Sequence, residues 1–449
     1  MTKLFGTDGI RGKAGVPPLD PATVSRVGAA LVRVLQGKDQ GRGPRLLIGR
    51  DTRESGEWIE RELSRGLGSE GASVVGVGVI PTPAVAYLTR SEGFDAGIVI
   101  SASHNPYEDN GIKVFSGRGE KVDEAVEAGI EQMIADASWA VNAQQHEPTL
   151  TYEPELPRHY AQHLQKILPS AGALSGSRLV LDCANGATTT IAPALFRALG
   201  FDVIAIGDQP DGRNINLRCG STFLDALGDK VRATSARLGV AFDGDGDRAL
   251  FVDRHGKTVD GDAILLIAGD QLQREGRLSG NAIVATVMSN IGLELALNER
   301  KIELVRAPVG DKYVMEQMQK RGAALGGEQS GHIIFADHLF TGDGIGTALQ
   351  VLRIMEATHR ELDDLAGALV TYPQVLVNVR VRERVDYTKV APIADAIREI
   401  EERVAGHGRV LIRYSGTEPL LRIMLEGKNH HEIRQWANEI ADLVKVHLG

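Results

Sequence analysis

The sequence predicts an α/β protein with three similar α/β domains and a smaller C-terminal α+β domain. Short apolar runs alternate with helical segments, and this pattern starts three times along the 449 residues. The 52 glycines recur where apolar runs end, as expected where strands stop at turns that open helices. The last part of the chain instead alternates apolar and polar residues, which is typical of a half-buried antiparallel sheet.

The first α/β unit is predicted to contain three buried strands and the helices between them. Asp20 is suited to cap the first of these helices, and Pro21 follows at the opening position, where a proline is well tolerated. We expect strands over residues 45–49, 73–79 and 97–101, and helices over residues 22–36 and 57–68.

Two further units repeat this rhythm before the tail begins. In the second unit we expect strands over residues 178–183, 202–206 and 238–242, and a helix over residues 190–199. In the third unit, which starts near Gly261, we expect strands over 282–286 and 302–306, and helices over 262–275, 291–299 and 311–321. In the tail we expect strands over 375–382, 409–413 and 421–426, and helices over 390–404 and 430–447.

A polar stretch over residues 135–157, which contains three prolines, marks the boundary between the first two units. The restarts of the pattern place the other boundaries. We therefore expect domains over residues 1–155, 156–255, 256–370 and 371–449.

The composition is that of a soluble globular protein and argues against several classes of function. The net charge of −9 and the aromatic content of 5% argue against nucleic acid as a partner. The two cysteines, Cys183 and Cys219, form neither a metal clamp nor a disulfide framework, and they favour a reducing compartment. The sequence has no bilayer-spanning apolar run and no signal-peptide core. We expect a cytoplasmic protein without a nucleic-acid or membrane partner.

The strongest local motif is Asp-Gly-Asp-Gly-Asp-Arg at residues 243–248, directly after an apolar strand. Alternate residues of an extended chain point the same way, so Asp243, Asp245 and Asp247 can reach one cation, for which Mg²⁺ is the expected ion. An EF-hand loop is excluded, because Arg248 stands at its glycine position. The alternative is an acidic surface turn, but the buried strand before the motif favours a metal site.

The second motif is Ser-Ala-Ser-His-Asn-Pro at residues 101–106, which follows another apolar strand. A serine hydroxyl at a strand end can act as a nucleophile or carry a phosphate, and Lys113 could supply a cation or a proton nearby. The alternative makes Ser103 a turn residue or helix cap and His104 a structural hydrogen-bonding residue. There is no Gly-x-Ser-x-Gly elbow, which argues against acyl transfer.

Two further loops have the composition of ligand-binding loops. Residues 326–332, Gly-Gly-Glu-Gln-Ser-Gly-His, suit a polyhydroxylated ligand, because Glu328 accepts hydroxyl protons and Gln329 both donates and accepts. Residues 413–419, Arg-Tyr-Ser-Gly-Thr-Glu-Pro, together with Arg422 suit a phosphate group. Each loop could also be an ordinary turn. No Walker loop occurs, so ATP-driven phosphoryl transfer is not indicated.

In this order and spacing, the four motifs resemble those of the α-D-phosphohexomutase superfamily. The likeness covers essentially the whole chain, from Phe-Gly-Thr-Asp-Gly-Ile-Arg-Gly at residues 5–12 to the loop at residues 413–419. Within the superfamily the chain is most similar to the branch that acts on glucosamine phosphates, since the other branch more often has Met in place of Gln329. The resemblance implies a heart-shaped protein, with mixed sheets in its α/β domains, in which four domains surround a central cleft and each contributes one motif.

The resemblance also implies roles for single residues, including Ser103 as a phosphoserine. The residues implied to act near the reacting groups are Ser103, Lys113, His332, Arg11 and Arg248. The resemblance does not indicate which of them carries the proton. Those implied to bind substrate are Glu328, Gln329 and Ser330 at the sugar, and Arg413, Ser415, Gly416, Thr417 and Arg422 at its phosphate. Those implied to bind the metal are Ser103, Asp243, Asp245 and Asp247.

The implied reaction interconverts glucosamine 6-phosphate and glucosamine 1-phosphate through a bisphosphate, and its product feeds UDP-N-acetylglucosamine and cell-wall precursor synthesis. The implied cofactors are one Mg²⁺ per chain, the phosphate on Ser103, and glucosamine 1,6-bisphosphate or glucose 1,6-bisphosphate as primer. The expected partner is a small hexosamine phosphate, and a homodimer is a further option because superfamily members often dimerise. The alternative within the superfamily is a phosphomannomutase/phosphoglucomutase.

Two rival functions outside this reaction use parts of the same motifs. A metal-dependent phosphatase would need the aspartates and would release inorganic phosphate. A regulator that binds sugar phosphates without chemistry would not need Ser103. An assay of phosphate release beside an assay of isomerisation separates the three.

Overall fold

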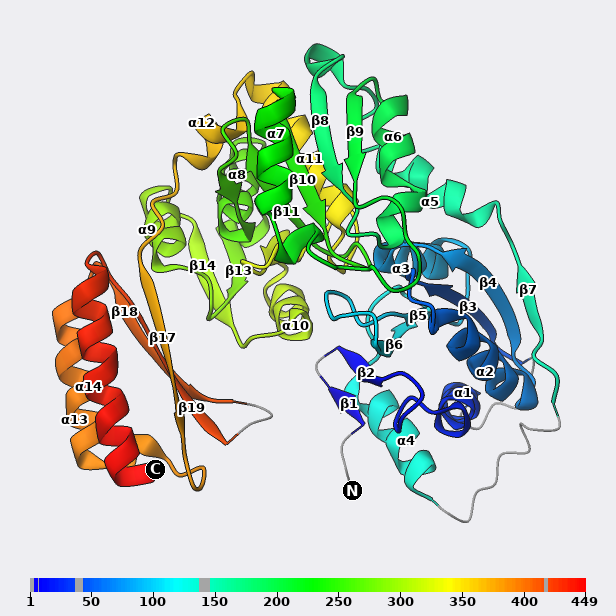
Figure 1. Cartoon of the computed structure of the whole chain (residues 1–449), viewed down its shortest axis with the longest axis horizontal. Helices are drawn as coiled ribbons and strands as arrows, with labels where there is room; N and C mark the ends of the chain where they lie inside the picture. The colour runs from blue at the N-terminus through cyan, green and yellow to red at the C-terminus, as the bar shows by residue number, and fades with distance from the viewer. Residues whose placement is uncertain (1–3, 7, 37–42, 137–145, 416–418) are drawn as a thin grey trace. The chain divides into compact units, whose positions relative to one another are not determined.

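A computed structural model provides the structure of the chain and describes residues 4–6, 8–36, 43–136, 146–415 and 419–449. The chain divides into two compact units (Figure 1). The first comprises residues 1–286 and 305–366, and the second comprises residues 287–304 and 367–449.

The first sheet of the first unit has the strand order β1-β2-β6-β5-β3-β4-β7. Helix α1 packs against α2 and α4, and the apolar faces of these helices and of the strands form one continuous core. The strands are β1 Phe5–Gly6, β2 Gly9–Lys13, β3 Arg45–Arg50, β4 Ser73–Val79, β5 Ala96–Ile100, β6 Asp109–Ser116 and β7 Leu150–Tyr152. The helices are α1 Pro21–Gln36, α2 Gly56–Ser69, α3 Thr82–Ser91 and α4 Glu124–Ala135.

The second sheet of the first unit has the strand order β12-β11-β10-β8-β9, and the third sheet has the order β14-β13-β15-β16. The strands of the second sheet are β8 Arg178–Asp182, β9 Asp202–Ile206, β10 Leu238–Phe242, β11 Ala249–Asp253 and β12 Thr258–Val259. Those of the third are β13 Ala282–Thr286, β14 Glu303–Ala307, β15 Leu325–Gly327 and β16 Ile333–Phe335. The helices of this part are α5 Leu156–Gln165, α6 Ala192–Ala198, α7 Asp225–Thr234, α8 Gly261–Arg274, α10 Asp311–Arg321, α11 Gly344–Thr358 and α12 Leu362–Ala366.

Within the described residues, these sheets share one four-strand order: β6-β5-β3-β4, β11-β10-β8-β9 and β16-β15-β13-β14. In each, the second strand runs antiparallel to the first and parallel to the third. The turn after that second strand therefore lies at the carboxyl end of a parallel strand, where α/β proteins bind ligands. The three turns are residues 101–108, 243–248 and 328–332. The predicted similarity of three α/β domains with mixed sheets is confirmed.

The second unit contains an antiparallel sheet in the order β17-β19-β18. Helices α13 and α14 cover one of its faces (Figure 1) and share an apolar core with the strands. The strands are β17 Gln374–Arg380, β18 Arg409–Tyr414 and β19 Leu420–Glu426, and the helices of the unit are α9 Ile291–Glu299, α13 Ala391–Val404 and α14 His430–Leu448. The predicted C-terminal α+β domain with alternating strands is confirmed.

The element bounds follow the predicted ones closely where local signals are strong. Asp20 accepts a 3.1 Å hydrogen bond from the Thr23 amide, as expected of a cap at the start of α1. The helix predicted over residues 190–199 begins only at Ala192, because residues 187–190 form a 3₁₀ turn and Ile191 has a non-helical backbone. Of the polar stretch over residues 135–157, residues 137–145 lie outside the described residues.

The remaining short elements are 3₁₀ turns at Gly172–Leu174, Ala187–Thr190, Gly220–Thr222, Ser279–Asn281 and Tyr387–Lys389. Among the helices of the described residues, none combines the length and the apolar character needed to cross a membrane.

Candidate active site

Ser103 occupies a buried turn between β5 and β6 and is held there by a chain of hydrogen bonds. Its side chain is almost fully buried, and its φ of +52° is uncommon for a residue with a side chain. Its amide donates to the Ser101 hydroxyl at 2.9 Å, and that hydroxyl donates to Oδ2 of Asp51 at 2.6 Å. Nδ1 of His104 lies 3.3 Å from the Ser103 hydroxyl. The sequence thus places a hydroxyl in a strained turn that its neighbours fix.

The buried Arg53 guanidinium fixes the carbonyl side of the same turn. Its Nη2 donates to the carbonyl oxygens of Ser103 and Asn105, each at 2.9 Å, and its Nη1 donates to the carbonyl of Pro106. The side-chain amide of Asn216, from the loop after β9, donates to the Ser103 carbonyl at 2.9 Å. These bonds stabilise the backbone that presents the Ser103 hydroxyl.

The turn of Ser103 meets the aspartate loop after β10 directly. The Ser103 hydroxyl donates to Oδ2 of Asp243 at 2.6 Å. A side chain at Gly244 would place its Cβ 2.6 Å from the carbonyl oxygen of Ser103, so only glycine permits this approach. Two of the motifs singled out in the sequence therefore form one site.

The three aspartates of this loop converge as the sequence predicts. One carboxylate oxygen from each of Asp243, Asp245 and Asp247 lies within 4.8 Å of the others, and all three side chains are buried. Burial and the neighbouring charges of Asp247 and Asp245 raise the pKa of Asp243 well above its ordinary value. Three buried carboxylates this close repel one another unless a cation is bound, so the cluster has the properties of a metal site.

Lys113, from β6, supplies a cation next to the aspartates. Its Nζ lies 2.8 Å from Oδ2 of Asp245, 3.4 Å from Oδ2 of Asp247 and 3.0 Å from Oδ2 of Asp8. Burial alone would lower the pKa of Lys113, but Asp245 and Asp8 raise it well above its ordinary value. Lys113 is therefore a fixed, charged group of the site.

Arg248 and His332 also lie next to these aspartates. The Arg248 amide donates to Oδ1 of Asp243 at 3.1 Å, and its Nε lies 3.9 Å from Oδ1 of Asp247. The His332 Nδ1 lies 3.6 Å from Oδ2 of Asp247, and its Nε2 accepts a 3.0 Å hydrogen bond from the Gly342 amide. Because Nε2 is an acceptor, the ring proton faces Asp247. Burial lowers the pKa of His332, but the carboxylates of Asp247, Asp311 and Glu328 together raise it by more.

Residues that sequence reasoning did not single out complete this part of the site. Asp8 accepts from Arg11 and Lys113 and also pairs with Lys121. The Thr82 hydroxyl, at the start of α3, donates to Oδ2 of Asp245 at 2.6 Å. Asp8 lies within the motif at residues 5–12, but nothing in the sequence near this single acid indicates that it pairs with three cations.

The loop between β15 and β16 contains the residues predicted to bind a sugar. Oε1 of Glu328 accepts from the Gly310 amide at 3.2 Å, and the Ser330 hydroxyl donates to its Oε2 at 3.3 Å. The side-chain amide of Gln329 donates to Oδ2 of Asp260, the residue before α8, at 3.1 Å. Glu328 also contributes to the electrostatic environment of Arg248, whereas the Gln329 side chain is engaged within its own domain.

The residues predicted to bind a phosphate lie in the second unit. Arg413 of β18 and Arg422 of β19 are direct cross-strand partners, and Arg422 donates to the Ser415 hydroxyl at 3.3 Å. Burial and the charge of Arg422 lower the pKa of Arg413. Like charges directly opposite on a sheet are destabilising without an anion between them, which fits a phosphate site. The predicted Gly416 and Thr417 lie outside the described residues.

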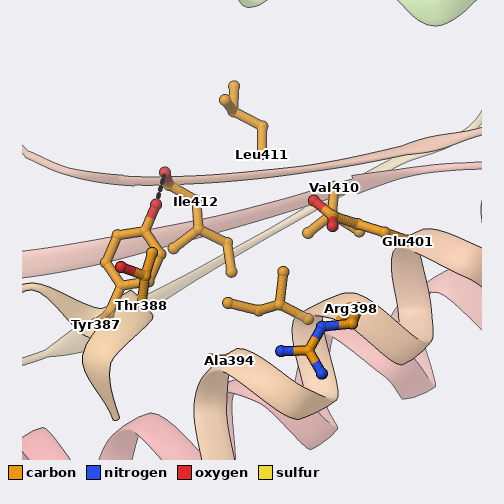
Figure 2. Close-up of a pocket in the computed structure, with 9 residues that line it drawn as sticks. Tyr387, Thr388, Ala394, Arg398, Glu401, Val410, Leu411 and Ile412 are labelled. Carbon is orange, nitrogen blue, oxygen red and sulfur yellow. Dashed lines mark hydrogen bonds between the residues drawn. The ribbon is translucent and has the colours of Figure 1, made fainter. Parts of the chain in front are cut away.

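A separate pocket of about 450 Å³ lies in the second unit, between α13 and β18 (Figure 2). None of the predicted site residues lines it within the described part of the chain. It is therefore distinct from the candidate site. Its lining residues are Tyr387, Thr388, Ala394, Ile397, Arg398, Glu401, Val410, Leu411 and Ile412.

Four family profiles match consecutive parts of the chain, and all describe phosphoglucomutase/phosphomannomutase domains. The alpha/beta/alpha domains I, II and III match residues 2–140, 158–256 and 260–372, and the C-terminal domain matches residues 376–443. The matches follow one another in the order of the four motifs.

Curated relatives are similar over their full length. The phosphoglucosamine mutase of Solibacter usitatus is 51% identical over 99% of this chain and 99% of its own. That of a Geobacter species is 47% identical over 100% of this chain and 99% of its own.

Solved structures share the fold. A phosphoglucomutase/phosphomannomutase family protein from Burkholderia thailandensis has a TM-score of 0.80 at 25% identity, covering 99% of this chain and 97% of its own. An Aspergillus fumigatus N-acetylphosphoglucosamine mutase, solved with GlcNAc-6P and magnesium, has a TM-score of 0.70 at 18% identity, covering 99% and 95%. Profiles, relatives and folds agree, and the chain belongs to the phosphoglucosamine mutases of the phosphohexomutase superfamily.

Proposed function

We propose that the chain interconverts glucosamine 6-phosphate and glucosamine 1-phosphate, with Ser103 carrying the phosphoryl group between turnovers. The observation that carries this proposal is the 2.6 Å hydrogen bond from the Ser103 hydroxyl to Asp243, inside a buried cluster of aspartates. Phosphoryl transfer is catalysed mainly by positioning and charge compensation, and this arrangement supplies both. The relatives named phosphoglucosamine mutase support the amino-sugar substrate.

The aspartate cluster fits a divalent cation, and we propose Mg²⁺. Among the described residues, Oδ1 of Asp245 and Oδ1 of Asp247 are buried without a hydrogen-bond partner, and carboxylate oxygens are the ligands that Mg²⁺ prefers. When bound, the ion would offset negative charge on the phosphoryl group during transfer. The residues that would hold it are Ser103, through its phosphate, and Asp243, Asp245 and Asp247.

The chain's own part in the reaction begins with phosphorylated Ser103. Its phosphoryl group passes to the free 6-hydroxyl of glucosamine 1-phosphate: the bond from Oγ to phosphorus breaks, the bond from O6 to phosphorus forms, and the hydroxyl proton ends on Oγ. The bisphosphate then reorients and returns its other phosphate to Ser103, which leaves glucosamine 6-phosphate. Glucosamine 1,6-bisphosphate or glucose 1,6-bisphosphate would prime an unphosphorylated chain.

The cations around Ser103 would hold the phosphoryl group in line for transfer. Lys113 is locked between carboxylates and serves as a fixed charge, because its raised pKa keeps it protonated. Arg11, Arg248 and His332 extend the same ring of donors, which an acidic chain with a net charge of −9 must concentrate at its anion site.

The sugar and its second phosphate would be bound by the other two loops. Glu328, Gln329 and Ser330 offer acceptors and donors for sugar hydroxyls or the 2-ammonium group. The phosphate that does not react would be bound by Arg413, Ser415, Gly416, Thr417 and Arg422. We further propose that each loop belongs to one of four domains, over residues 1–155, 156–255, 256–370 and 371–449.

A substrate panel tests this proposal. With a trace of bisphosphate primer, kcat/KM is measured for the 1-phosphates of glucosamine, glucose and mannose, and inorganic phosphate is measured in parallel. We expect glucosamine 1-phosphate to be preferred by about tenfold to a hundredfold, the value of one charge-assisted hydrogen bond.

Each rival function predicts a different outcome in this panel. An equal or higher kcat/KM for glucose or mannose phosphate would place the chain with the phosphomannomutases/phosphoglucomutases. Stoichiometric phosphate release would indicate a phosphatase, and binding without turnover would indicate a regulator. Gln329→Met serves as a matched variant, because it substitutes the residue more common in the other branch; we expect it to lose preference for the amino sugar.

A further inference from the structure

Helix α10 begins with two oppositely charged residues, of which the first pairs with the segment between β6 and α4 and the second with α4 itself. Asp311 pairs with Lys121, with Oδ2 and Nζ 2.5 Å apart. Its neighbour Lys312 pairs with Glu127 at 3.3 Å and with Glu124 at 3.5 Å, both on α4. We call these contacts the α10 clasp. They join the third sheet's helix to the first sheet's surroundings within one compact unit.

The two halves of the clasp differ in what lies behind them. The Lys121 ammonium also pairs with Oδ1 of Asp8, whose other oxygen lies 3.0 Å from Nζ of Lys113. On the other side, Oδ2 of Asp311 lies 3.6 Å from Nε2 of His332. Through Asp8 and Asp311, Lys121 is therefore connected to Lys113 and His332 of the candidate site. Lys312 instead pairs with carboxylates of α4.

Lys121 is well suited to hold both carboxylates in place. Its side chain is 13% exposed, and those of Asp8 and Asp311 are 19% and 14% exposed, so water screens the pairs only weakly. Burial lowers the pKa of Lys121, but Asp311 and Asp8 raise it by more, which keeps the ammonium charged. One fixed charge thus bridges the N-terminal hairpin and the start of α10.

We propose that Lys121 is a positioning residue for the reaction: by fixing Asp8 and Asp311, it sets the positions of the Lys113 ammonium and the His332 ring. This inference rests on the proposed function. Without Lys121, Asp8 would still pair with Lys113 and Arg11, but its second oxygen would lose its partner. Asp311 would be free to turn toward His332. Both groups that face the aspartates would then lose their fixed geometry, on which transfer depends.

The test compares Lys121→Met with Lys312→Met, since each variant removes one lysine of the α10 clasp and only the first touches the site. Isomerisation of glucosamine 1-phosphate, with bisphosphate primer, gives kcat and KM, and thermal melting gives stability. We expect Lys121→Met to lower kcat by about tenfold to a hundredfold with KM nearly unchanged, as for other residues that orient catalytic groups. Lys121→Arg should restore most of kcat. Lys312→Met should melt lower but keep the kcat of the wild type.

Equal kcat losses in the two methionine variants would show that the clasp is merely structural and overturn the inference. An unchanged kcat in Lys121→Met would overturn it as well. If Lys121→Met does not fold, Lys121→Met combined with Asp311→Asn removes the unpaired charge, and its kcat must still be low. A wild-type chain that does not isomerise glucosamine 1-phosphate would overturn the proposed function too, whereas equal losses beside an active wild type overturn the positioning role alone.

Discussion

The Ser103 hydroxyl donates a 2.6 Å hydrogen bond to Oδ2 of Asp243, although the two residues are 140 positions apart in the chain. The contact joins the turns that follow β5 and β10, two strands with equivalent places in their sheets. A phosphate on that hydroxyl would enter the space beside all three aspartates. The repeated topology of the sheets thus places the proposed phosphate carrier against the proposed metal ligands.

Removal of one metal ligand should abolish most of the activity. Asp245→Asn keeps the shape of the side chain but removes one of the charges that a divalent cation requires, which we expect to cost several kcal/mol of transition-state stabilisation. Isothermal titration with Mg²⁺ and the isomerisation rate are the measurements, and excess EDTA should stop the wild type reversibly. Full activity in EDTA would show that the cluster is an acidic turn.

The fold could be predicted well where local pattern and environment agree. The predicted strand over 73–79 and the predicted helix over 311–321 coincide with β4 and α10. Strand β6 was not predicted, because it opens with Asp109, Asn110 and Gly111, which are turn formers. Helix α11 was not predicted either, because it is buried on nearly all sides and so lacks the polar face that marks an amphipathic helix.

The site could be predicted in its motifs but not in its supporting contacts. The aspartates and Ser103 stand out because reactive residue types gather in short segments after strands, and Lys113 stands out because it follows Ser103 closely in the sequence. Arg53 and Asp8 do not stand out, because the role of a single buried charge depends on partners that lie far away in the sequence. Lys121 was missed for the same reason, since Asp311 lies 190 positions further on.

Arg53 should be essential for stability as well as for activity. Arg53→Met would leave the buried carboxylate of Asp51 without its cation, and breaking such a buried pair costs about 3–5 kcal/mol. We expect a clear fall in melting temperature and a lower kcat, because the turn of Ser103 loses its anchor. Arg213→Met is the control: its pair with Glu54 is exposed, so water and salt screen it and its loss should hardly change the melting temperature. Equal melting temperatures for the two variants would contradict this account.

His163 should make the fold sensitive to acid. Its ring is stacked between Tyr87 and His338, and burial, followed by the charge of His338, lowers its pKa from 6.5 to about 4. The folded state therefore favours the neutral ring. This contribution to stability is present in full above pH 6.5 and is lost as the pH falls from there toward 4.

His163→Phe keeps the stacking but cannot be protonated, so its melting temperature should fall less than that of the wild type between about pH 7.5 and about pH 5. Substitution of the exposed His431 by Phe controls for the loss of a histidine elsewhere. If the melting temperatures of His163→Phe and the wild type fall equally over this pH range, His163 does not contribute to the acid sensitivity of the fold.

Arg422→Ala should mainly weaken substrate binding. We expect KM to rise by about tenfold to a hundredfold, the equivalent of about 1.5–3 kcal/mol for a charge-assisted hydrogen bond, because the phosphate bound there does not react in that half of the cycle. Some loss of kcat is expected, since the bisphosphate must also be held while it reorients. Arg380→Ala, an exposed arginine on the neighbouring strand β17, is the matched control. A collapsed kcat with unchanged KM would place Arg422 at the reacting centre.

The most direct test of the central claim follows the phosphate itself. The chain is labelled with ³²P from a bisphosphate primer, freed of sugar, and mixed with glucosamine 1-phosphate in a single turnover. We predict that the label is on Ser103, that Ser103→Ala takes up none while remaining folded, and that the label leaves the protein in glucosamine 6-phosphate, by way of labelled glucosamine 1,6-bisphosphate. Label that stays on the protein, appears as inorganic phosphate, or is taken up equally by Ser103→Ala would contradict the account.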